Sequence, residues 1–334
     1  MSTGIEGTSS PAGADVPPTE PAEGAALVAD GMAVIARTQG QLVRRRFFRH
    51  RAALLGMLVL GSVIVLAYSS IGIGPYDGWW DKSYLRTADV IDGGRPTLMA
   101  DGKFQLGEHP FGQDNVGKDY FALVMRGTQQ SLVVAFLIGI VVTVLGTLVG
   151  ALAGFFRGRV EGVLMRITDV MISIPTLIFA AVLAAIAGRS GIIVLGIALG
   201  LVTWTGLARL VRGEFLALRE KEFVEAARAI GTSSWRIIYK HILPNTVGVI
   251  IVTATLAIAS GILLETALSF LGLGVQPPDV SLGSLVSQYQ TAMVSRPWLF
   301  WWPGIFIVVI ALSVNFIGDG LRDAFDPRQT QVRD

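Results

Sequence analysis

The stretch SLVVAFLIGIVVTVLGTLVGALAGF, residues 131–155, contains no charged side chain and decides the class of the fold. An apolar run of about 18 or more residues predicts a helix that spans a bilayer. This run is long for one crossing, so the helix is expected to tilt or to extend beyond the lipid. Five further apolar runs lie over residues 52–70, 168–187, 190–208, 246–264 and 300–318. The sequence therefore predicts an all-α membrane protein with six transmembrane helices.

The composition indicates the same class and excludes several others. The 334 residues are 52% hydrophobic and 16% charged, whereas a soluble domain carries about 25% charged residues. A net charge of +2 gives no reason to expect nucleic acid as a partner. Because the chain has no cysteine, a disulfide framework, a thiolate zinc site and a catalytic thiol are excluded. Its three histidines are far apart in sequence and lack metal-ligand spacing.

Lysine and arginine are concentrated on one side of the predicted spans. With the N-terminus in the cytoplasm, 19 of the 27 Lys and Arg residues fall in cytoplasmic segments. Six of the others lie in the long first outer loop, where the charge rule is weak. We therefore expect both termini in the cytoplasm. Residues 1–36 contain no Lys or Arg and no apolar run, which predicts a disordered tail rather than a secretion signal.

The predicted spans divide the chain into four parts. These are a disordered cytoplasmic tail (1–43), the first span with its extracytoplasmic loop (44–130), a five-helix core (131–320) and a cytoplasmic tail (321–334). The core includes a cytoplasmic loop over residues 209–244. The amphipathic end of the outer loop, Tyr120 to Gln130, is expected to lie along the outer membrane surface.

Small residues within the spans predict where helices pack. Gly146, Gly150 and Gly154 recur every four residues and share one face of the second span, and Gly196 and Gly200 do the same in the fourth. Glycine faces let two backbones approach closely in lipid, and we prefer this interpretation to glycine hinges for gating.

Two features interrupt the third and fourth spans. Pro175 should kink the third helix or mark its start. A few residues around Gly188 and Arg189 separate the two spans, which predicts a tight helical hairpin.

The polar loop of residues 209–244 is too long for a turn. Residues 220–230 are good helix formers and Gly231 is a natural helix stop. The residues Thr232 to Ser234 can cap a second helix that runs towards Pro244. The loop is therefore predicted to be a helix, a glycine turn and a second helix.

A small apolar face is predicted on the first of these helices. Ala226, Ala227 and Ile230 fall on one side at helical spacing. Such a face on a charged cytoplasmic helix pair suits a groove on another protein. The alternative is a loop that only covers its own helix ends.

The loop resembles the signature segment of ABC importer permeases. The resemblance rests on Glu225-Ala226-Ala227, on Gly231 after three intervening residues, and on Leu243-Pro244 after a fixed gap. In that family this segment forms a coupling helix in a cleft of the ATPase subunit. The broader family has isoleucine where this chain has His241, and the variant His241-Ile-Leu-Pro-Asn245 resembles the peptide/nickel branch.

Three further segments resemble the same branch. They are HPFGQDNVGKD (109–119), in which Gln113 and Lys118 replace the usual Thr and Arg, ETALSFLGLG (265–274) followed by Pro277-Pro278, and NFIGDGLRDAFDPR (315–328). With the basic first span, the likeness covers roughly residues 40–330. The chain resembles the second, C-type permease subunit of a dipeptide or oligopeptide importer, with the type I ABC importer permease fold.

One segment is similar to a nucleotide-binding motif. Residues 112–119 nearly fit the phosphate-binding pattern G-x-x-x-x-G-K-[ST], but Asp119 stands where a Ser or Thr hydroxyl must hold magnesium. No apolar strand precedes this segment, and its predicted place is outside the cell. A P-loop is therefore excluded, and the energy source must lie on another chain.

Two carboxylates lie near predicted membrane depth, where a charge is a functional candidate by default. Asp169 is expected at the cytoplasmic start of the third span, where a carboxylate suits a helix N-terminus. Glu265 lies about 21 residues after Pro244, roughly 30 Å along a helix and near the outer interface. Each is either a solvated or capped helix end or a gating or pathway residue.

The resemblance implies a transport subunit with no catalytic, cofactor or metal site of its own. It implies a heterodimer with a related permease in the bacterial plasma membrane, two ATPase subunits that hold ATP and magnesium, and an extracytoplasmic substrate-binding protein. Peptides are the favoured substrate, with nickel or another small solute as the alternative. A secondary transporter would more often show an ionisable relay at mid-membrane or broken helices in repeated halves, and neither is apparent in the sequence.

Overall fold

The computed structural model describes residues 39–326 except 75, 101–102, 105–106 and 188–189. Most of the predicted N-terminal tail, Gly188 and Arg189 of the predicted hairpin, and the last eight residues lie outside this part of the chain. The chain divides into two units, 1–41 and 42–334. Of the first unit, the structure describes Gln39–Gln41, the first turn of a helix.

Helices form nearly all the regular structure of the described residues. They are α2 (Gln39–Phe47), α3 (Arg51–Ile71), α4 (Tyr120–Phe156), α5 (Gly158–Ser173), α6 (Thr176–Ala187), α7 (Ile192–Thr203), α8 (Thr205–Leu218), α9 (Glu222–Ala229), α10 (Ser234–Arg236), α11 (Leu243–Phe270), α12 (Leu282–Tyr289) and α13 (Trp298–Phe325). The π-helix η3 (Ile237–Ile242) joins α10 to α11, and η1 (Asp92–Gly94) and η4 (Gln290–Met293) are short 3₁₀ helices. The segment between α3 and α4 adds a two-residue antiparallel pair, β1 (Met99–Ala100) with β2 (Lys103–Phe104).

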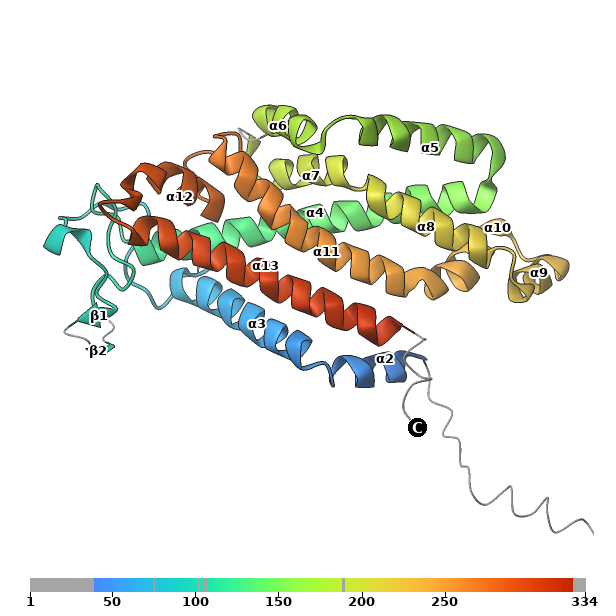
Figure 1. Ribbon diagram of the computed structural model, residues 1–334, viewed down its shortest axis with the longest axis horizontal. Helices are drawn as coiled ribbons and strands as arrows, with labels where there is room; N and C mark the ends of the chain where they lie inside the picture. The colour runs from blue at the N-terminus through green and yellow to red at the C-terminus, as the bar shows by residue number, and fades with distance from the viewer. Residues whose placement is uncertain (1–38, 75, 101–102, 105–106, 188–189, 327–334) are drawn as a thin grey trace, which may run out of the picture. The chain divides into compact units, whose positions relative to one another are not determined.

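The long helices account for the predicted spans. Four helical segments are long and apolar enough to cross a membrane: α3, α4, the continuous α10–η3–α11 segment and α13. Two further helix pairs are apolar enough together but are bent, since α5 meets α6 at 89° and α7 meets α8 at 49°. Counting each bent pair as one span gives six in the predicted order, which confirms the all-α class (Figure 1).

The break in the third span is explained by Pro175. The residue before it, Ile174, ends α5 in an extended conformation with ψ 126°, and α6 begins at Thr176. A proline disfavours the helical conformation of the preceding residue and cannot donate a backbone hydrogen bond. Pro175 therefore marks the start of the second half of this span, one of the two outcomes predicted.

Helix α4 packs against α8, α7, α11 and α3. The glycine faces lie in these contacts and confirm the helix-packing interpretation. A Cβ added at Gly150 would lie 2.5 Å from the Ala208 carbonyl oxygen, and one at Gly154 would lie 2.5 Å from the Phe215 Cβ. Glycine is therefore required where α4 crosses α8. Gly200 meets Val141 of α4 in the same way, at 2.5 Å.

The start of α4 differs from the prediction. Residues 120–130 form the first three turns of α4 and are almost fully buried, so the expected surface helix is wrong. Asp119 caps the helix by accepting from the Ala122 N–H at 2.8 Å. The polar side chains that ended the apolar run are bonded internally: Gln129 Nε2 donates to the carbonyls of Ala67 and Gly72 at 2.9 Å each. These bonds satisfy the buried amide of Gln129 and two carbonyl groups at the C-terminal end of α3.

Candidate functional site

The short helix α9 lies at one end of the bundle, opposite the end that holds α12 (Figure 1). Its inner side consists of Val224 and Ala227, which are buried in one apolar cluster with Phe155, Phe215 and Ile238. Three elements therefore hold α9, namely the end of α4, the end of α8 and the π-helix η3. The apolar contacts fix the helix to the bundle before any partner binds.

The predicted glycine turn ends α9 by a defined hydrogen-bond pattern. The Thr232 N–H donates to the Ala227 carbonyl at 3.0 Å, and the Gly231 N–H donates to the Arg228 carbonyl at 2.9 Å. This pair of bonds is the Schellman motif, which needs a left-handed residue just after the helix. Gly231 supplies it with φ +77°. The prediction of a glycine stop at residue 231 is confirmed.

The outer side of α9 is open. Glu225, Ala226 and Gly231 are exposed, and the side chain of Ile230 is 83% exposed. A Cβ at Gly231 would meet no atom within 4 Å. An isoleucine this exposed next to an open glycine is a surface suited to a partner. Ala227 differs from the prediction, because it packs inward rather than sharing this face.

The helix after the glycine turn does not stop at Pro244. Ser234–Phe270 is continuous, and its N-cap Ser233 makes no side-chain capping bond, contrary to the predicted capping. The Leu243 N–H donates five residues back to the Ile238 carbonyl. This wider turn accommodates Pro244, which has no N–H and whose ring crowds the preceding turn. Leu243 and Pro244 thus mark a π-helical turn at the root of the α9 segment.

Glu265 lies at the other end of the bundle, in α11. It is fully buried, so its interpretation as a solvated helix end is wrong. The Ser269 hydroxyl donates to Oε1 at 2.6 Å and the Ser131 hydroxyl donates to Oε2 at 3.3 Å. A buried carboxylate with two donors is compensated rather than isolated.

Both donors connect Glu265 to the first turn of α12. Ser131 Oγ accepts from the Leu282 N–H at 3.1 Å. Ser269 Oγ lies 3.3 Å from the Oγ of Ser281, the N-cap residue of α12. The same Ser281 Oγ accepts from the Ser284 N–H. Because the Ser269 proton points to Glu265, Ser281 must donate to Ser269. These hydrogen bonds connect both oxygens of the carboxyl group to the first turn of α12 through serine hydroxyls.

Asp169 lies on an exposed surface. It accepts from Arg209 of α8 at 2.6 Å, and both side chains are about half exposed. The expectation of a helix N-terminus is wrong, because α5 begins at Gly158 and Asp169 lies in its last turns. A second pair, Arg212 Nε to Glu161 Oε1 at 2.8 Å, joins the same two helices. Asp169 is thus part of an ionic attachment between α5 and α8.

The segment similar to a P-loop has a structural role. Asp114 Oδ1 accepts from the backbone N–H groups of Val116 and Lys118 at 2.9 and 2.8 Å. A carboxylate of the chain thereby occupies donors that a phosphate would need. Asp119 also has a partner within the chain, since His109 Nδ1 lies 2.7 Å from its Oδ2. Among the described residues, no group of three or more His, Asp or Glu could hold a metal ion.

Sequence reasoning missed the interactions of this loop with distant elements. Trp80 Nε1 donates to Asp119 at 3.0 Å, and Tyr289 of α12 donates to Asp114 Oδ2 at 2.9 Å. The two partners of each pair lie far apart in the sequence, so no local motif predicts the contact. The carboxylates in the stretch 109–119 were the available signal, because buried acids need partners.

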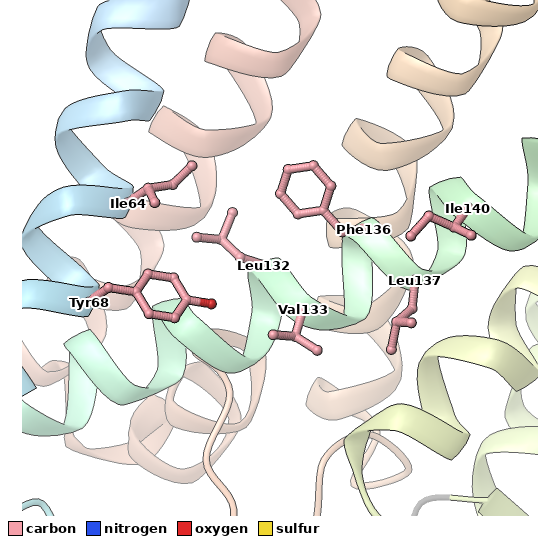
Figure 2. Close-up of a pocket in the computed structure, with 7 residues that line it drawn as sticks. All are labelled: Ile64, Tyr68, Leu132, Val133, Phe136, Leu137 and Ile140. Atoms are coloured by element: carbon pink, nitrogen blue, oxygen red, sulfur yellow. The ribbon is translucent and has the colours of Figure 1, made fainter. Parts of the chain in front are cut away.

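An apolar groove lies between α3 and α4. Its volume is 380 Å³, and it is lined by Ile64, Tyr68, Leu132, Val133, Phe136, Leu137 and Ile140 (Figure 2). The Tyr68 hydroxyl is the sole polar side-chain atom among these residues (Figure 2). The groove therefore suits an apolar occupant and carries no chemistry of its own.

Comparison with known proteins agrees with this arrangement of spans and loop. Residues 146–331 match the family described as binding-protein-dependent transport system inner membrane component, which is more than half of the chain. The chain belongs to this family. Residues 38–85 also match the N-terminal transmembrane domain of oligopeptide transport permease C. The chain is therefore a permease subunit, and α9 and η3 lie within the part that defines the family.

Two curated relatives extend the match over most of the permease. The oligopeptide transport system permease protein OppC of Escherichia coli K12 is 40% identical over 294 residues, 87% of this chain and 92% of that protein. OppC of Mycobacterium tuberculosis H37Rv is 37% identical over 293 residues, 87% of this chain and 96% of that protein.

A solved structure supports the fold. A chain from inward-facing conformations of the MetNI methionine ABC transporter matches with a TM-score of 0.51 and 21% identity. The match covers 61% of this permease and 96% of that chain. The likeness confirms the fold of an ABC importer permease.

Proposed function

We propose that this permease forms half of the translocation pathway of an ATP-driven peptide importer and couples it to separate ATPase subunits. The observation that carries the proposal is α9, whose inner side is fixed by Val224 and Ala227 while Ile230 and Gly231 stay open. A helix that is anchored on one side and exposed on the other can transmit the movement of a docked partner to the bundle.

The coupling residues are Glu225, Ala226, Ala227 and Gly231, with Leu243 and Pro244 at the root. Glu225 and Ala226 face outward and would contact the ATPase directly. Ala227 acts from the inside, because it packs against the bundle. The π-helical turn before Pro244 joins α9 to α11, so a push on α9 would reach the whole span.

The proposed mechanism is alternating access. ATP binding closes two ATPase subunits, α9 moves with them, and this permease and a related one switch from inward-facing to outward-facing. ATP and magnesium are bound by the ATPase chains, and this chain carries out no catalysis. An extracytoplasmic binding protein delivers substrate to the open outer side.

The proposed orientation places α9 and both termini in the cytoplasm of a bacterial cell. Support comes from the Lys and Arg residues, which gather on the side of α9. On this orientation Glu265 and α12 lie at the outer mouth, where the carboxylate holds α12 in place and affects gating through it. Asp169 lies on the cytoplasmic half and attaches α5 to α8.

Peptides are the proposed substrate because the relatives of this chain are oligopeptide permeases. Nickel or another small solute is the second candidate, which the four segments of the peptide/nickel branch leave open. An ATP-independent transporter is disfavoured, because an exposed docking helix would have no role in it.

The test is to purify the tagged chain from native membranes in mild detergent and to identify the co-purifying chains by mass spectrometry. A related permease and ATPase chains are expected. A recovered binding protein is then tested with peptides and with nickel, which separates the two substrates. Repeated recovery of this chain without an ATPase would contradict the proposal.

A further inference from the structure

Three arginines gather beside the last turn of α4. The guanidinium carbons of Arg219 and Arg228 lie 5.8 and 5.7 Å from the centroid of the Phe155 ring. Arg219 also donates to the Phe155 carbonyl oxygen, and Arg157 follows α4 directly and pairs with Glu220. The ends of α4 and α8 and the helix α9 thus each bring one arginine to the same place.

The positive charge of this cluster is not balanced. Glu220 is the one carboxylate within ion-pair distance of the three arginines in the described part of the chain. Over the same residues, the guanidinium group of Arg228 makes no hydrogen bond or ion pair. Burial, followed by the charges of Arg228 and Arg157, lowers the pKa of Arg219, and Glu220 opposes this shift. An anion at this position would relieve the repulsion.

The cluster lies where the apolar part of α4 ends. Beside it are exposed apolar side chains: Phe156 is 41% exposed and Val160 is 43% exposed. The ring of Trp235 lies 6.1 Å from that of Phe156 and is also exposed. Tryptophan next to basic residues at the end of a span is typical of the headgroup level of a membrane. Exposed apolar side chains and the unbalanced positive charge of the arginines therefore lie next to each other at the end of α4.

We propose that Arg157, Arg219 and Arg228 bind the headgroup of an anionic phospholipid, with its acyl chains on Phe156 and Val160. Guanidinium groups match the geometry of a phosphate and bond it in a bidentate manner. Basic pockets between transmembrane helices bind such headgroups in other membrane proteins. Because Arg228 belongs to α9, the lipid would also hold α9 against the bundle. The site depends on the membrane location and not on the identity of the substrate.

A carboxylate of a protein partner is the competing ligand. The position of the cluster favours the lipid. Arg228 and Arg219 face Phe155 in the last turn of α4 rather than the exposed end of α9 at Ile230 and Gly231. The lipid also explains why exposed apolar residues adjoin the arginines.

The experiment is native mass spectrometry of the purified transporter, titrated with phosphatidylglycerol and, separately, with phosphatidylcholine. Wild type is compared with Arg219→Gln/Arg228→Gln. The control Arg44→Gln/Arg45→Gln removes the same charge from exposed arginines of α2. Because Arg219 bonds the end of α4, Arg228→Gln alone is included as a variant that removes no hydrogen bond within the described residues.

We expect wild type and the α2 control to retain phosphatidylglycerol in preference to phosphatidylcholine. The double variant should bind phosphatidylglycerol about tenfold or more weakly, and Arg228→Gln should be intermediate. Equal retention of both lipids by wild type, or an equal loss in the α2 control, would overturn the proposal. Loss of the ATPase with unchanged lipid binding in Arg228→Gln would overturn it too, and would assign the cluster to a protein partner.

Discussion

The hydroxyl of Ser269 lies 2.6 Å from Oε1 of Glu265 and donates to a carboxylate that no solvent reaches. Ser131 donates to the other oxygen and receives the Leu282 N–H in turn. The first turn of α12 is therefore connected by hydrogen bonds to the carboxyl group of Glu265 in α11. An amide of the same shape could not accept from both serines, because one of the two oxygens would be replaced by an NH2 donor.

The first prediction concerns Glu265→Gln. The amide keeps the size of the side chain but replaces one acceptor by a donor, so one serine loses its acceptor in a buried place. We expect a loss of about 1–3 kcal/mol in the free energy of unfolding and reduced uptake. Thermal unfolding of the solubilised transporter and uptake of labelled peptide in cells measure the two effects.

The control for this prediction is Glu108→Gln, whose carboxylate is 75% exposed in the segment between α3 and α4. This change should leave stability within about 0.5 kcal/mol and uptake unaltered. Normal unfolding together with normal uptake in Glu265→Gln would refute both the attachment of α12 and the role in gating.

The second prediction uses two adjacent alanines of α9. Ala227→Leu adds volume inside the cluster that holds α9, so we expect a stability loss of about 1–3 kcal/mol. Ala226→Leu adds the same volume on the exposed side and should leave stability of the isolated subunit unchanged. It should nevertheless weaken recovery of the ATPase, measured by co-purification. Equal unfolding temperatures for the two variants would contradict the described placement of Ala227.

Much of the fold could be predicted from the sequence, because apolar runs and glycine spacing are local signals. Pro175 and Gly231 each determine the backbone at their own position, and both predictions are confirmed. The first turns of α4 were missed because Gln129 and Gln130 read as polar. Their burial depends on distant partners, such as the Ala67 carbonyl, that a window of sequence does not contain.

The site residues were predicted less completely than the spans. Glu265 was placed near one end of its span, but its burial depends on Ser131, 134 residues earlier in the chain. Ala227 was assigned to the docking face because helical spacing does not say which side meets Phe155. The π-helical turn at Pro244 has a local cause, yet the sequence equally allows a helix end there.

The third prediction tests the crossing of α4 and α8. Gly150→Ala places a Cβ 2.5 Å from the Ala208 carbonyl oxygen and 2.7 Å from Val211 Cβ, so the helices must separate. We expect a loss of about 1–3 kcal/mol in stability and lower amounts of transporter in the membrane. The matched control is Gly206→Ala in α8, where no atom lies within 4 Å of the new Cβ. It should be neutral or stabilise by about 0.5–1 kcal/mol. Similar unfolding of the two variants would contradict the close contact.

The last prediction addresses coupling through Gly231→Glu. A Cβ added at this position meets no atom within 4 Å, so the bundle should still fold and insert. The left-handed conformation, with φ +77°, costs a non-glycine residue about 1–2 kcal/mol. Gly231→Ala carries the same cost without the bulk and charge, and so serves as the matched control. We expect Gly231→Glu to abolish uptake and ATPase binding at normal membrane levels, while Gly231→Ala retains most of both. Unaltered uptake in Gly231→Glu would refute docking at this turn, and equal loss in both variants would trace the defect to the backbone instead.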